Sequence, residues 1–138
     1  MCDNENNQDC ECIYKVLKTI LLLQNQDFNC SENLGCDKPY LGPTPSVVCY
    51  NTRPINLYNC ATGELWEFPY TVNGITGTST VFRVESLDNC CCTCRILYPN
   101  PDTTEGTSEF SATNEFFTIN LNCVGAIKCL NDTFVELC

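Results

Sequence analysis

Cysteine is the residue type on which any chemistry of this chain must depend. The sequence holds 14 cysteines in 138 residues and no histidine. Such a density usually marks a protein that is stapled by disulfides. The missing histidine removes the usual general base and the usual activator of a nucleophilic side chain. The cysteines stand at positions 2, 10, 12, 30, 36, 49, 60, 90, 91, 92, 94, 123, 129 and 138.

The size of the chain indicates that folding does not require all of these cysteines. With 43% hydrophobic residues, 138 residues can bury the core of a single domain. Some cysteines are therefore predicted to join one molecule to the next, and those on a mobile arm, at the C-terminus or in a dense cluster are best placed. These intermolecular candidates are Cys2, Cys10, Cys12, Cys138, Cys90, Cys92 and Cys94.

The densest cluster lies over residues 90–94. Its Cys91-x-x-Cys94 spacing matches a thiol redox motif, but that motif needs a strand-to-helix turn, and no helix is predicted here. In a strand, Cys90, Cys92 and Cys94 would share one face and Cys91 would take the other. This geometry favours cross-linking over catalysis.

The rest of the composition excludes several classes of function. A second CxxC pair with zinc-site spacing is missing, and the acidic residues are scattered, so we predict no catalytic residue, no metal site and no cofactor. Lys and Arg number 7 against 17 Asp and Glu, for a net charge of −10. Nucleic acids and anionic membrane surfaces repel such a chain, so neither is expected as a partner.

The hydrophobic pattern predicts a mainly β fold, an antiparallel β-sandwich with one N-terminal helix. Residues 1–10 read as a flexible, cysteine-bearing arm and 11–138 as a single β-rich domain. Ile13, Leu17 and Ile20 follow the spacing of a helix over 11–25, and Asn73-Gly74 is a hairpin turn signal. Strands are predicted over 46–50, 55–60, 65–72, 78–85, 91–98, 110–123 and 124–130.

No secretory signal is visible near the start of the chain. Its first residues are acidic, and the longest aliphatic run, Ile20 to Leu23, is too short for a signal peptide or a membrane span. A cysteine content typical of exported proteins therefore stands beside a sequence without an export signal. We expect a chain that is made in a cytosol and meets oxidant later.

Three segments carry a resemblance to a known family. They are CDKPYLG at 36–42 with NTRP at 51–54, then VFRVES at 81–86, and TINLNCVGAIKCL at 118–130. Over roughly residues 10–132, the chain resembles the bacterial spore coat and exosporium proteins of the CotZ/CotY/ExsY family. The resemblance implies that Cys36, Cys91 as one of the 90–92 run, Cys123 and Cys129 match family cysteines with a structural role.

The resemblance implies a structural protein of the endospore surface, in the outer coat or the exosporium. Such a protein would be made in the mother cell cytoplasm and would assemble with itself and with other coat or exosporium proteins into disulfide-cross-linked layers. Fixed within strands, Cys123 and Cys129 should pair locally or stay buried. Two alternatives remain: a secreted disulfide-rich binding or inhibitor domain, which would stay monomeric, and a thiol-redox or metal-binding protein.

Overall fold

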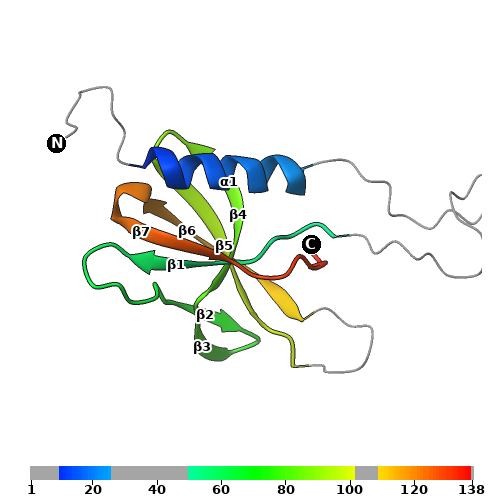
Figure 1. The fold of residues 1–138 in the computed structure, drawn as a ribbon. Coiled ribbons are helices and arrows are strands. Elements are labelled where there is room, and N and C mark those ends of the chain that lie inside the picture. Colours follow the sequence, from blue (N-terminus) through cyan, green and yellow to red (C-terminus); the bar gives the residue numbers. More distant parts are fainter. Residues whose placement is uncertain (1–9, 26–49, 102–108, 138) are drawn as a thin grey trace, which may run out of the picture.

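The computed structural model describes residues 10–25, 50–101 and 109–137. Within them the protein is mainly β with a single helix near the N-terminus, as the sequence predicts (Figure 1). The elements are α1 (Glu11–Gln24), β1 (Ile55–Asn59), β2 (Phe68–Val72), β3 (Ile75–Ser79), β4 (Val81–Asp88), β5 (Cys91–Pro99), β6 (Phe110–Asn120), the short 3₁₀ helix η1 (Leu121–Cys123) and β7 (Val124–Cys129).

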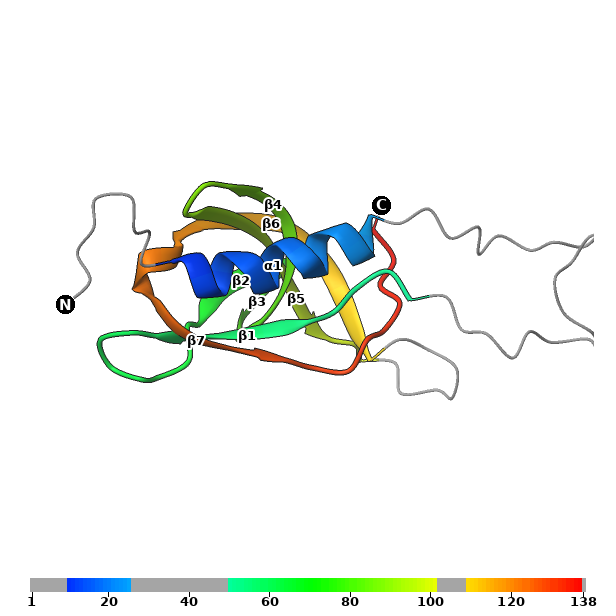
Figure 2. The ribbon, with the colours of Figure 1, turned by 45° about the horizontal axis from the view of Figure 1, so that its top comes forward.

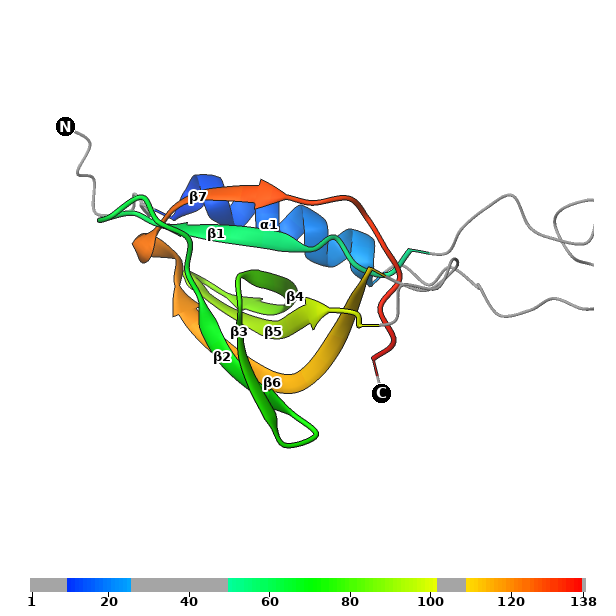
Figure 3. The ribbon, with the colours of Figure 1, turned by 90° about the horizontal axis from the view of Figure 1, so that it is seen from below.

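The main sheet has five strands in the order β6-β5-β4-β1-β7, and β2 and β3 form a separate hairpin. All pairings between the named strands are antiparallel. β1 pairs with β7 along its whole length but meets β4 at only one position, Ile55 opposite Phe82. The β1–β7 pair therefore diverges from β4, β5 and β6, and the sheet curves around its own core (Figure 3).

Helix α1 closes one side of that core. The residues predicted to form its apolar face, Ile13, Leu17 and Ile20, are all buried. Burying side chains of this size contributes roughly 1.5–3 kcal/mol each. Gln24 fixes the far end of the helix: its Nε2 donates to the Val84 carbonyl at 2.9 Å, and its Oε1 accepts from the Arg53 N–H at 3.0 Å.

The β2–β3 hairpin packs on the core at the other end of the curved sheet (Figure 1). Its turn is the predicted Asn73-Gly74, whose φ angles of 52° and 79° match the left-handed conformation that a two-residue hairpin turn requires. Phe68 stacks on Phe117 with ring centroids 3.8 Å apart and meets Phe82 edge-on at 5.7 Å. These aromatic contacts tie the hairpin to the main sheet.

Three predicted strands have clearly different bounds in the structure. The strand predicted over 110–123 ends at Asn120, and residues 121–123 form η1 instead. The strand predicted over 65–72 begins only at Phe68, and the one predicted over 78–85 is divided between β3 and β4. At the division the chain leaves the hairpin and enters the main sheet. The Ser79 hydroxyl holds this corner, because it accepts from the Val81 N–H at 3.0 Å and donates to the Leu97 carbonyl. The strand predicted over 46–50 and the arm at 1–9 lie outside the described residues.

A buried arginine links β4 to the residues that lead into β1. Arg83 is 6% exposed. Its guanidinium donates to the Thr52 hydroxyl at 2.8 Å, to the Asn51 carbonyl at 2.9 Å and to Glu85 at 2.8 Å. Glu85 also accepts from Arg95 at 3.0 Å. The FRVES segment therefore places Phe82 and Val84 in the core and a charged network on the opposite face of the sheet.

Asn51 and Thr52 in turn hold the C-terminal segment. The Asn51 amide exchanges hydrogen bonds with the backbone of Val135, at 2.8 and 2.9 Å, and Thr52 pairs with Thr133. Because the same two residues accept from Arg83, one buried side chain connects β4, the entry to β1 and the last described residues. Within the part of the chain that the structure describes, no helix is long and apolar enough to cross a membrane.

Candidate functional site: the cysteine end

Several cysteines from separate elements gather at one end of the molecule, which we call the cysteine end. It comprises the start of α1, the β4–β5 turn, the first residues of β5, the residue after β1, and η1 (Figure 2). Three contacts join these elements. Cys10 is bonded to Cys90, the Cys90 carbonyl accepts from the Leu121 N–H at 2.7 Å, and the Cys123 carbonyl accepts from the Cys60 N–H at 3.0 Å.

The Cys10–Cys90 disulfide fastens the start of α1 to the β4–β5 turn. The two Cα atoms are 5.9 Å apart, and Cys10 is fully buried. Cys10 directly precedes α1 and already accepts the first helical hydrogen bond, from the Tyr14 N–H at 2.7 Å. The sequence placed Cys10 on a free arm and offered both cysteines as links between molecules. In the structure the packing of α1 on the core brings them together instead, and each uses its sulfur within the chain.

Cys92 and Cys94 lie inside the core. They share one face of β5, as strand alternation predicts, and their Sγ atoms are 3.6 Å apart. The hydrogen bond with Cys92, together with burial, raises the pKa of Cys94 well above its ordinary value. Both were offered as links between molecules, and here the structure corrects the prediction. Because both thiols are buried, neither can reach a partner on another molecule, and the raised pKa of Cys94 further disfavours its attack.

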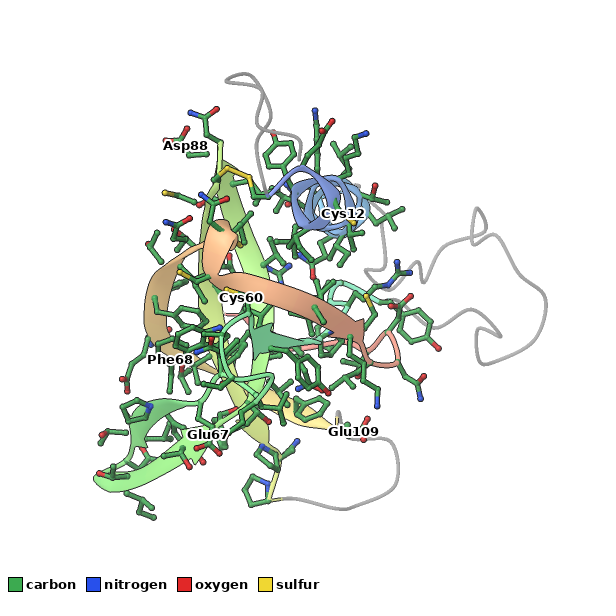
Figure 4. The ribbon with its side chains drawn as sticks, turned by 60° about the vertical axis from the view of Figure 1, so that its left-hand side comes forward. Cys12, Cys60, Glu67, Phe68, Asp88 and Glu109 are labelled. Carbon is green, nitrogen blue, oxygen red and sulfur yellow. A yellow bond between two sulfur atoms is a disulfide. The ribbon has the colours of Figure 1, made fainter. Side chains whose placement is uncertain are left out.

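The exposed thiols of the cysteine end are a different set. Cys12 lies on the outer surface of α1 (Figure 4), and Cys91 takes the solvent face of β5, opposite to Cys92. Cys60 and Cys123 are also exposed. The Cys91-x-x-Cys94 motif is therefore divided between the surface and the core. A redox pair must be able to close into a disulfide. Residues three apart in a strand have Cα atoms about 10 Å apart, beyond the roughly 7 Å limit, so this arrangement does not support a thioredoxin-like site.

Cys129 is exposed at the other end of β7. Sequence reasoning expected Cys123 and Cys129 to pair locally or to stay buried. In the structure both are exposed free thiols, so the expected burial is corrected. Cys129 lies close to an ion pair in which Arg53 Nε donates to Asp132 at 2.6 Å and a second bond spans 3.0 Å. The hydrogen bond from Arg53 lowers the pKa of Asp132, and the same bond raises the pKa of Arg53.

Cys60 is the exposed cysteine that sequence reasoning did not single out. It follows β1 and precedes the turn formed by Ala61, Thr62 and Gly63. A cysteine between a strand and its turn signal stands at the rim of a sheet, which is the pattern that could have identified it. Of the described residues, no group of three or more Cys, Asp or Glu side chains could hold a metal ion. Five cysteines fall outside the described ranges: Cys2, Cys30, Cys36, Cys49 and Cys138.

The fold and the distribution of thiols define a cysteine-rich, mainly β protein that combines one internal disulfide, a buried thiol pair and exposed thiols at two places. The sequence model of the family described as Spore coat protein Z matches residues 1–112, and the chain belongs to this family. The resemblance found in the sequence is thereby confirmed, and a structural role in the spore coat, at the spore surface, is supported. No curated protein and no solved structure matches the chain.

Proposed function

We propose that this protein is a structural subunit that assembles with itself into an ordered layer of the spore surface, in which disulfides between exposed cysteines lock neighbouring subunits together. The observation that carries the proposal is the presence of exposed thiols at two separate places on a body that already has a closed core and an internal disulfide. Folding and cross-linking can therefore use different cysteines.

The two places lie at opposite ends of β7. Cys12 and Cys91 belong to the cysteine end, whereas Cys129 ends the strand. A strand of 6 residues spans roughly 20 Å at its usual rise. Thiols confined to one place would give closed dimers, but links at two separated places allow each subunit to join two others and the assembly to grow. Cys2 and Cys138, outside the described residues, stay predicted as further links.

Exposed apolar side chains accompany these thiols. On α1, Val16 and Leu23 follow Cys12 at helical spacing, and the two residues are 36% and 41% exposed. Such a stripe can associate with a neighbouring subunit before any covalent bond forms. We therefore expect non-covalent oligomers to form first and disulfides to add kinetic resistance afterwards.

The proposal gives the cysteines a structural rather than a catalytic role. Cys91 and Cys94 face opposite sides of β5, and the raised pKa of Cys94 is contrary to what an attacking thiol needs. The remaining parts of the proposal follow from the family. The chain would be made in the mother cell cytoplasm, oxidised at or after assembly, and joined to other coat or exosporium proteins in the outer coat or the exosporium.

Oxidised assemblies of the wild type and of a triple variant, Cys12→Ser, Cys91→Ser and Cys129→Ser, test the proposal. Wild-type assemblies should show ordered sheets or tubes by negative-stain microscopy and should remain high-mass bands in hot detergent without reductant. The triple variant should still assemble, since its apolar surfaces are intact. In the same detergent most of it should leave the high-mass bands, because only links through Cys2 and Cys138 are left.

The matched control is the variant Cys60→Ser with Cys123→Ser, which removes exposed thiols from the same end and should keep the high-mass bands. Circular dichroism checks that each variant keeps its β-rich fold. Sedimentation of only monomer under oxidising conditions would refute assembly and would favour the secreted binding domain. A triple variant whose bands match those of the wild type would refute the assignment of the linking cysteines.

A further inference from the structure

The backbone places Cys60 and Cys123 opposite each other at the rim of the sheet. The β1–β7 ladder is antiparallel, and its last pair is Asn59 with Val124. Cys60 follows Asn59 and Cys123 precedes Val124. The two cysteines therefore continue the register that the ladder takes after its shift between Tyr58 and Asn59. The Cys60 N–H donates a hydrogen bond to the Cys123 carbonyl at 3.0 Å, so the two segments are still in contact there.

The side chain of Cys60 is turned toward this neighbour. Its Sγ lies 3.4 Å from the carbonyl oxygen of Asn122, which belongs to the peptide bond that leads into Cys123. Gly125 explains how the start of β7 comes so close to the residue that follows β1. A Cβ built on Gly125 would lie 2.9 Å from the Cα of Cys60, so any larger residue would push β7 away from the start of the turn.

This geometry fits a disulfide. Directly opposite residues of an antiparallel pair have Cα atoms roughly 4.5–5.5 Å apart, and disulfides require roughly 4.4–6.8 Å. Both cysteines are exposed and free, so solvent and small oxidants reach them. Both also lie outside the regular strands, Cys60 in the turn after β1 and Cys123 in η1, where side chains can rotate without disturbing the ladder.

We propose that Cys60 and Cys123 form a second disulfide within the chain when the protein is oxidised. The oxidant is a low-molecular-weight disulfide. One Cys thiolate attacks it and releases one small thiol, and the other Cys thiolate then displaces the second. Two S–H bonds break and one protein S–S bond forms. The two electrons and two protons leave with the two small thiols.

The bond would complete the covalent closure of the cysteine end. Cys10–Cys90 joins α1 to the β4–β5 turn, and the Cys90 carbonyl already holds Leu121 in η1. Cys60–Cys123 would add the end of β1 to the same group. It would also remove two exposed thiols from exchange between molecules and leave Cys12 and Cys91 as the described exposed thiols of this end. The inference does not depend on assembly.

Disulfide mapping of isotopically mixed protein tests the pairing. Equal amounts of ¹⁴N and ¹⁵N protein, at about micromolar concentration, are oxidised with oxidised glutathione, alkylated, and digested without reductant. Opposed thiols in one chain have an effective concentration on the order of millimolar, about a thousandfold above that of a second molecule. The peptide that joins Cys60 to Cys123 should therefore be all-light or all-heavy, and alkylation of both cysteines should be lost.

Single variants supply the controls. Cys60→Ser should restore alkylation of Cys123, and Cys123→Ser should restore that of Cys60, whereas Cys12→Ser should change neither. Mixed-isotope peptides would show that the bond joins two molecules and would overturn the proposal. It would equally be overturned if Cys123 paired with Cys91, or if both cysteines remained alkylated or carried glutathione. Each result is independent of whether the protein forms layers.

Discussion

Cys10 and Cys90 are joined although 80 residues separate them in the sequence. The bond connects the residue before α1 to the turn between β4 and β5, so it closes a loop that contains the helix, β1, the hairpin and β4. Closing a loop of this length is expected to stabilise the folded state mainly by restricting the unfolded chain.

Replacing both cysteines, Cys10→Ala with Cys90→Ala, should lower the free energy of unfolding by about 4 kcal/mol. Alanine avoids leaving a polar hydroxyl at the buried Cys10 position. Urea unfolding followed by circular dichroism measures the change. Cys12→Ser is the matched control: it removes an exposed thiol two residues away and should shift stability by less than about 0.5 kcal/mol. An equal, small effect of both variants would contradict a stapling role for the bond.

The Glu85 carboxylate forms ion pairs with two guanidinium groups, those of Arg83 and Arg95. Its side chain is 21% exposed, and that of Arg83 only 8%. Removing the carboxylate leaves a nearly buried cation without its partner, so Glu85→Gln should destabilise the fold by about 3 kcal/mol. Differential scanning calorimetry measures this loss as a lower melting temperature.

Glu67→Gln provides the comparison for Glu85→Gln, because Glu67 is exposed just before β2 (Figure 4). Its effect should stay within about 0.5 kcal/mol. If the two variants melted at the same temperature, the charged network around Glu85 would contribute nothing measurable to the stability of the fold.

Much of the fold follows from local patterns. The helical spacing of Ile13, Leu17 and Ile20 predicted α1, and Asn73-Gly74 predicted the hairpin turn, because periodicity and turn chemistry act over a few residues. The division between β3 and β4 was not predicted. At that point Thr78, Thr80 and Val81 are all β-prone residues, so no local signal marks the break. It is set by a long-range contact between Ser79 and Leu97.

The roles of the individual cysteines were much harder to predict than the elements that carry them. Alternation correctly placed Cys91 and Cys92 on opposite faces of β5. It could not show which face is buried, and no local signal connects Cys10 to Cys90, because that pairing depends on how α1 docks on the sheet. Cys129 was expected to pair or to be buried, yet the strand that it ends lies at the edge of the sheet.

Alkylation of the native, non-assembled protein should separate the free cysteines into two groups. Cys92 and Cys94 are buried, and their mutual hydrogen bond and burial hold the pKa of Cys94 well above its ordinary value. Burial keeps the reagent from both thiols, and the raised pKa of Cys94 lowers the supply of its reactive thiolate, so both should react only after unfolding. Exposed Cys12, Cys91 and Cys129 should react in the folded state. Mass spectrometry of peptides after brief iodoacetamide treatment, with and without urea, measures the difference, and fast native labelling of Cys94 would contradict the buried pair.

The ion pair between Arg53 and Asp132 predicts a stability difference that depends on pH. Arg53 holds the pKa of Asp132 below its ordinary value of 3.8, so the folded state favours the carboxylate. Above that ordinary value the carboxylate is ionised in both states and the full contribution is present. As the pH falls through the lower folded pKa, the carboxylate is protonated and the contribution is lost.

Asp132→Asn should therefore destabilise the protein near neutral pH and have no effect well below the folded pKa of Asp132. Both side chains are about one third exposed, at 34% and 37%, so solvent screening limits the loss to about 1 kcal/mol or less. Urea midpoints at about pH 7 and about pH 2 measure the gap between wild type and variant. Asp88→Asn, which removes an exposed carboxylate from the end of β4, serves as the control and should shift neither midpoint appreciably (Figure 4). If the difference in urea midpoint between wild type and Asp132→Asn were the same at low pH, the contact with Arg53 would stabilise the fold through packing and not through charge.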